Sequence, residues 1–96
     1  MFVCLDGEYS YMGALFKVQM RTVSEEICNN IMKAYEKGYE HLIKTFKGYG
    51  KCIILLEQPI KLITVDNSIE LILKPKNFVA QMLWGEVVKR IKALCP

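Results

Sequence analysis

The chain has 96 residues, enough for one hydrophobic core and too few for a second, so we predict a single domain over residues 1–96. No apolar run approaches the roughly 20 residues that span a bilayer, and the N-terminus lacks the features of a signal peptide, so a cytoplasmic protein without membrane contact is expected. The net charge of +3 permits nucleic-acid binding but is too small to argue for it.

Hydrophobic residues make up 52% of the chain, a high share for a small domain. Either the core is unusually well filled, or an apolar patch is covered by another chain, most simply a second copy. We therefore expect a homodimer. Tyr9 and Tyr11 in the first hairpin and Trp84 in the last helix are the predicted interface residues, with a place in the core as the alternative for Trp84.

The four cysteines are Cys4, Cys28, Cys52 and Cys95, and no two of them form a C-x-x-C pair. This spacing does not support a metal site or a thioredoxin-like redox site. Free buried thiols are the expected state, with a disulfide as the alternative. We predict no cofactor and no metal.

The first 22 residues predict a β-hairpin. Residues 2–5 form a short apolar run, and Asp6-Gly7 is a turn signal, so the chain is expected to reverse between Asp6 and Ser10. The stretch "ALFKVQMR" then alternates, with Phe16, Val18 and Met20 on one face and Lys17, Gln19 and Arg21 on the other. Strict alternation predicts a half-buried strand with a basic outer face.

A change of period after Ser24 predicts a helix over residues 25–47. Ser24 is a good N-cap, two glutamates follow it, and apolar residues recur at steps of three and four. Gly38 lies in the middle and indicates a bend, a break into two helices or a close packing point. Gly48 is expected to end the helix in the left-handed conformation.

Three strands and a second helix complete the prediction. "KCIILLE" is almost wholly apolar, as a central strand would be, and "IKLITV" and "IELIL" flank a tight turn at residues 66–68. Pro75 ends the last strand, and Asn77 can cap a helix over "FVAQMLWGEVVKRIKAL". The order ββαβββα predicts an α+β fold of two layers, a mostly antiparallel sheet with both helices on one face.

The segment "HLIKTFKGYGKC" suggests a phosphate-binding loop, but the P-loop pattern fails. Cys52 stands where a hydroxyl is needed, and a helix precedes the loop instead of following it. A less exacting alternative is a nucleic-acid-binding module that uses strand cations and this loop, in which lysines contact phosphates and rings stack on bases. Its predicted residues are Lys17, Arg21, Lys44, Phe46, Lys47, Tyr49 and Lys51.

A small enzyme with its site at a dimer interface is the third alternative. It needs a cleft around His41, Cys52 or Glu57, but no spacing requires such a site, so no catalytic residue is predicted. The order αβββα from Glu25 onward resembles double-stranded-RNA-binding domains in topology. Their lysine cluster has no counterpart in "NFVAQMLWGE", so no binding residue carries over. The prediction is therefore a non-enzymatic protein-interaction domain that forms a homodimer, with a protein partner or nucleic acid as further possibilities.

Overall fold

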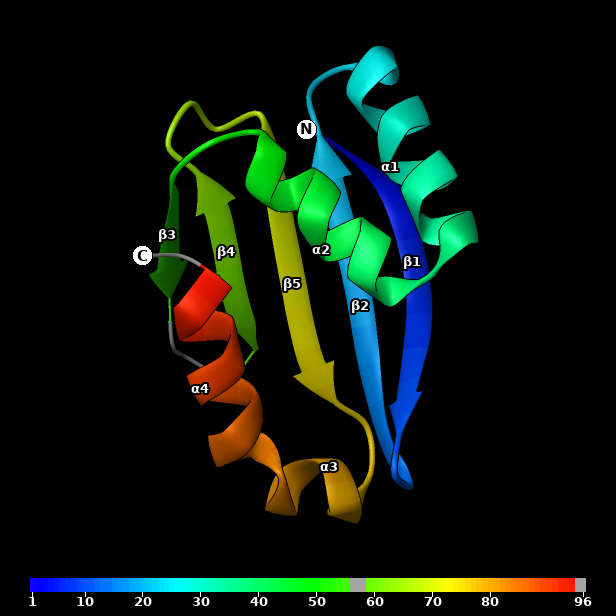
Figure 1. Ribbon diagram of the computed structural model, residues 1–96, viewed down its shortest axis with the longest axis vertical. Helices are drawn as coiled ribbons and strands as arrows, with labels where there is room; N and C mark the ends of the chain where they lie inside the picture. Colours follow the sequence, from blue (N-terminus) through cyan, green and yellow to red (C-terminus); the bar gives the residue numbers. More distant parts are fainter. Residues whose placement is uncertain (56–58, 95–96) are drawn as a thin grey trace.

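The computed structural model describes residues 1–55 and 59–94 and shows one five-stranded antiparallel sheet. Its strands are β1 (Phe2–Tyr11), β2 (Ala14–Thr22), β3 (Cys52–Leu55), β4 (Ile60–Thr64) and β5 (Ile69–Pro75), in the order β1-β2-β5-β4-β3. The helices are α1 (Glu25–Lys37), α2 (Tyr39–Gly48), α3 (Phe78–Met82) and α4 (Trp84–Leu94). All of them lie on one face of the sheet (Figure 1). The predicted α+β fold is confirmed.

The core lies between the sheet and the helices. On β2, β4 and β5 every second side chain is buried, as expected for strands with one covered face. The helices contribute Ile31, Leu42, Phe46 and Ile91 to the same cluster. The opposite face of the sheet, the open face, carries the alternate residues of each strand and is not covered by a helix (Figure 1).

The first hairpin turns later than predicted. β1 runs through Asp6-Gly7 and ends at Tyr11, and the chain reverses at Met12-Gly13. Both turn residues have positive φ, 48° and 83°, as the central residues of a type I′ turn do. This turn matches the twist of the two strands, and Gly13 adopts it without steric cost. The expected reversal between Asp6 and Ser10 is therefore wrong.

Each predicted helix is divided into two. Gly38 has a φ of 119°, outside the helical range, and separates α1 from α2. No other atom lies near the place where a Cβ would stand on Gly38, so the glycine is a break and not a packing point. Leu83 separates α3 from α4. Ser24 and Asn77 cap α1 and α3 as predicted, whereas α2 runs through Gly48, and Gly50 is the residue with positive φ.

β3 is an edge strand, not the central strand that its apolar sequence suggested. It pairs only with β4 among the described strands, and its side chains alternate between half-buried and exposed. Ile53 and Leu55 lie on the open face, exposed to solvent. β5 lies at the centre of the sheet, between β2 and β4. The outer faces of β2 and β5 are mostly polar, because a strand paired on both sides needs only one apolar face when the other meets water.

The cysteines also depart from the expected state. Cys4 in β1 and Cys28 in α1 form a disulfide, with their Cα atoms 5.6 Å apart. Cys52 is disulfide-bonded as well, and Cys95 lies outside the described residues. The expectation of free thiols is wrong, because the fold brings α1 against β1 and no sequence spacing indicates that approach. No helix in the described part of the chain is long and apolar enough to cross a membrane.

The turn between β4 and β5 is held by side chains. The Asp66 carboxylate accepts hydrogen bonds from the Ser68 hydroxyl at 2.7 Å and from the Ser68 backbone N–H at 3.0 Å. The hydroxyl bond, followed by the backbone bond, lowers the pKa of Asp66 below its usual value of 3.8, because both favour the charged form. The predicted tight turn at residues 66–68 is present.

We expect this carboxylate to make part of the stability depend on acid pH. Since the folded pKa is lower than the unfolded one, the contribution is complete above about pH 4 and is lost as the pH falls through the folded pKa. Urea unfolding between pH 2 and 5 should show a steeper loss of stability for the wild type than for Asp66→Asn. Equal slopes would contradict this role of Asp66.

Candidate interaction surface

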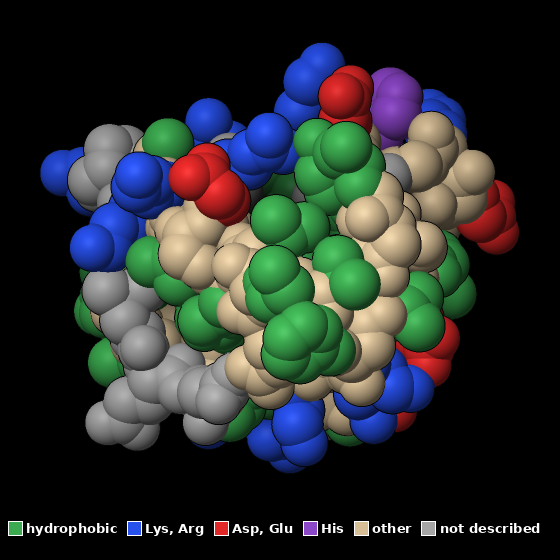
Figure 2. Space-filling model, turned by 90° about the horizontal axis from the view of Figure 1, so that it is seen from below, with side chains coloured by type: hydrophobic (Ala, Val, Ile, Leu, Met, Phe, Trp, Pro, Cys, Tyr) green, Lys and Arg blue, Asp and Glu red, His purple; other side chains and the backbone are tan. Residues whose placement is uncertain are grey.

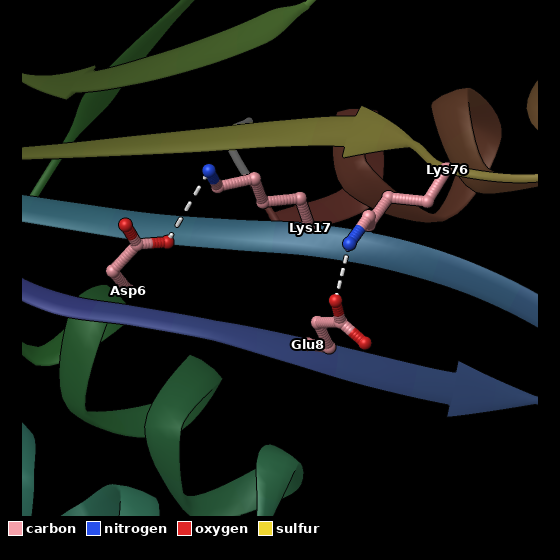
Figure 3. Close-up of polar contacts among 4 residues, drawn as sticks. All are labelled: Asp6, Glu8, Lys17 and Lys76. Carbon is pink, nitrogen blue, oxygen red and sulfur yellow. Dashed lines mark hydrogen bonds and ion pairs between the residues drawn. The ribbon is translucent and has the colours of Figure 1, made fainter.

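The open face of the sheet carries charges that are largely paired with one another. Lys17 on β2 lies 3.6 Å from Asp6 on β1, and Lys76, just after β5, pairs with Glu8 (Figure 3). Glu70 lies opposite Arg21 in the β2–β5 register and 3.9 Å from Lys61. These carboxylates compete with any phosphate for the same cations, so the open face is a poor anion-binding surface.

The residues predicted to bind nucleic acid are spread over two regions. Lys17 and Arg21 lie on the open face, whereas Lys44, Lys47 and Lys51 are exposed along α2 and just beyond it. Tyr49 is half-buried, and Phe46 is only 1% exposed within the core. A ring that is enclosed by side chains cannot stack on a base, so Phe46 contributes to folding in this structure. Binding of nucleic acid stays a prediction.

The three residues named for an enzyme do not come together as a site. His41 is exposed on α2, Cys52 is disulfide-bonded and therefore has no thiol, and Glu57 lies outside the described residues. Within residues 1–55 and 59–94, no three His, Cys, Asp or Glu side chains gather so that they could hold a metal ion. His41 and Cys52 therefore do not form the site that the enzyme alternative needs.

The largest apolar side chains left in solvent gather at the end of the molecule formed by α3 and the β1–β2 turn. Met12 is 79% exposed, Phe78 76% and Met82 68%, and Val79 is exposed beside them. Figure 2 looks at this end and shows hydrophobic side chains clustered at its centre. We call Met12, Phe78, Val79 and Met82 the apolar end. Clusters of exposed apolar side chains often mark a surface that contacts another molecule.

Asn77 attaches α3 to the hairpin and so brings the apolar end together. Its side-chain oxygen accepts from the backbone N–H of Ala80 at 2.9 Å, as a helix cap, and from that of Leu15 at 3.1 Å. Its side-chain nitrogen donates to the Gly13 carbonyl at 2.9 Å. One side chain therefore fixes the start of α3 against the hairpin turn, and the turn residue Met12 and the first helical residue Phe78 share one end of the fold.

A pocket of about 430 Å³ opens beside the apolar end, between the hairpin and the last two helices. The wall of the pocket on the sheet side includes Tyr9, Tyr11 and Phe16. The wall on the helix side includes Leu83 and Val87. The pocket is mostly apolar and within the size range of sites that accept a large side chain or a small ligand. The remaining residues that line it are Met12, Leu73, Val79, Glu86, Arg90 and Ile91.

Tyr11 and Trp84, two of the predicted interface residues, lie next to this pocket in different ways. Tyr11 lines it and carries the Arg90 guanidinium 5.4 Å above its ring centroid. Trp84 is half-buried and stacks on Phe16, with ring centroids 6.2 Å apart, so it supports the wall of the pocket from inside. Gly85 beside it has open space where a Cβ would stand.

The sequence singled out Tyr9 and Tyr11, which line the pocket, but not Met12, Phe78 or Met82. Phe78 and Met82 are four residues apart, a spacing that a helix would present on one face, yet they fall outside the predicted apolar stripe of Val79, Leu83 and Val87. Their position outside the stripe was the feature of the sequence that could have indicated their exposure.

Comparison with protein-family models, curated proteins and solved structures finds no match to this chain.

Proposed function

We propose that this protein is a non-enzymatic interaction domain that forms a homodimer through its apolar end. The observation that carries the proposal is the strong exposure of Phe78 and Met82 on the same end of the fold as a mostly apolar pocket, which Met12 and Val79 of the apolar end help to line. A two-fold interface places the same patch on both copies, so one patch must supply both the projecting and the receiving parts. The apolar end meets that condition, because Phe78 of one copy can enter the pocket of the other.

The charges on α4 support the same arrangement. Glu86 and Arg90 are one helical turn apart, both line the pocket, and both are exposed. If two α4 helices run antiparallel across a two-fold axis, each Glu86 faces the Arg90 of the other copy. Opposite charges then meet at both positions, which favours a second copy of this chain over a partner with different charges.

Removing the projecting side chains is expected to yield a monomer. In Phe78→Ser/Met82→Ser, two large apolar contacts are lost, and the dissociation constant should rise at least about 100-fold. Light scattering after size exclusion, over a range of micromolar concentrations, measures this change. Since both side chains are exposed, the thermal midpoint of the monomer itself should stay close to its wild-type value.

Ile53→Thr is the matched control, because Ile53 is also exposed and apolar but lies on the edge strand β3. It should leave the dimer intact. Glu86→Arg and Arg90→Glu should each weaken the dimer about tenfold, and the double reversal should restore it, because the two charges face each other across the axis. A wild-type monomer at high concentration, or dissociation by Ile53→Thr alone, would refute the proposed interface.

A further inference from the structure

Residues of α1 and α2, together with Tyr49, line a second hollow. The two helices lie toward the opposite end of the sheet from α3 (Figure 1). The volume of the hollow is about 340 Å³, and buried Ala34 lies among its lining residues. The walls are formed by Asn30, Lys33 and Lys37 from α1 and by His41, Thr45 and Tyr49 from α2 and the residue after it. We call this hollow the basic groove. It does not overlap the apolar end, so dimerisation leaves it accessible.

Every side chain that lines the basic groove and can carry a charge near neutral pH is basic. Lys33, Lys37 and His41 are exposed, and no carboxylate is among the lining residues. Within the described ranges, neither lysine nor His41 takes part in an ion pair, in contrast to Lys17 and Lys76 on the open face. Cations that converge on one hollow without a carboxylate raise the local concentration of anions.

Neutral donors complete the groove. The Tyr49 hydroxyl accepts a hydrogen bond from the Asn30 side-chain nitrogen at 3.2 Å, which joins the two walls and leaves the hydroxyl proton available for an acceptor. The Thr45 hydroxyl is a second donor on the same wall. Two ammonium groups, an imidazole and two hydroxyls can together donate to a tetrahedral group with several acceptor oxygens.

We propose that the basic groove binds phosphate groups. A phosphomonoester carries up to two negative charges on three terminal oxygens, and a phosphodiester carries one charge on two. Either group can accept from the two lysines and the hydroxyl donors of this hollow. The phosphate can belong to a small phosphorylated molecule or to a nucleic-acid backbone. The groove is distinct from the open face and from the lysines at the end of α2 that the sequence indicated.

Titration calorimetry at low salt, with inorganic pyrophosphate and with a short oligothymidylate as separate probes, tests the proposal. Lys33→Gln/Lys37→Gln should weaken binding about tenfold, since two charge-assisted contacts are lost. Lys44→Gln/Lys47→Gln removes the same charge from exposed α2 positions outside the lining and should change the affinity less than about twofold. Thr45→Val, which alters no charge, should weaken binding about threefold through the lost hydroxyl donor.

The two probes distinguish the source of the phosphate. Binding of pyrophosphate alone assigns the groove to small phosphorylated molecules, and an oligothymidylate that competes with pyrophosphate assigns it to a nucleic-acid backbone. Both results support the groove, provided that the Lys33 and Lys37 variant loses the binding. The proposal is overturned if neither probe binds, or if the Lys44 and Lys47 variant loses as much affinity, since general attraction to a positive surface would then account for binding.

Discussion

Breaking the disulfide between Cys4 and Cys28 is expected to lower the free energy of unfolding by about 3.5 kcal/mol, from the chain-entropy estimate for cysteines 24 residues apart. The cross-link restricts the unfolded chain and ties β1, an edge strand, to α1. For a domain of 96 residues, this loss corresponds to a fall in the thermal midpoint of about 15–25 °C. Urea and thermal unfolding without reductant measure both quantities.

The variants Cys4→Ala, Cys28→Ala and the double replacement form a mutant cycle. Because each single change breaks the same covalent bond, each should cost nearly as much as the double. The prediction would be contradicted if each single variant lost less than about 1 kcal/mol and the double variant lost the sum of the two. Such values would reflect lost packing alone. Disulfides are rare in reducing compartments, so in the cytoplasm expected from the sequence the chain would rely on its noncovalent contacts.

Thr64→Val is expected to cost about 2–3 kcal/mol, although the two side chains have nearly the same shape. Thr64 is 1% exposed, and its hydroxyl oxygen accepts from the backbone N–H groups of Ser68 and Ile69, both at 3.0 Å. Valine offers no acceptor to either buried N–H group, although Ser68 N–H keeps its bond to Asp66. Urea unfolding at neutral pH measures the loss.

Thr64→Ser is the control for this prediction. It keeps the hydroxyl and removes one buried methyl group, so its cost should be about 1 kcal/mol. If serine proved as costly as valine, packing of the methyl group and not the hydrogen bonds would account for the role of Thr64. Thr22 donates to the Ser68 carbonyl at 3.0 Å from the neighbouring strand, so the same turn is held from both sides.

Local patterns in the sequence predicted most of the fold. Alternation on β2, the caps Ser24 and Asn77, and the stop at Pro75 each depend on residues close together in the chain, and the structure has all of them. The errors lie where local patterns allow two outcomes. Asp6-Gly7 resembles a turn but lies within β1, and the apolar "CIIL" stretch resembles a central strand but lies at the edge.

The candidate sites were less accessible to sequence reasoning. Tyr11 could be placed near the hairpin, but nothing local shows that Asn77 reaches the Gly13 carbonyl and ties the start of α3 to the hairpin turn. Likewise, Lys33 and His41 fall on separate helices, and only the break at Gly38 turns those helices toward one another. The apolar end depends on contact between distant segments, and the basic groove depends on the angle between two consecutive helices.

The sequence by itself therefore determined the class of the fold, most of the succession of strands and helices, and a surplus of apolar residues. Periodicity and capping act over one or two turns of chain, so they can be recognised without knowing the fold. The tertiary structure decided the strand order, the pairing of Cys4 with Cys28, and which apolar side chains remain in solvent. Those features arise from packing between segments far apart in the chain. The free energy of that packing cannot be inferred from a local sequence pattern.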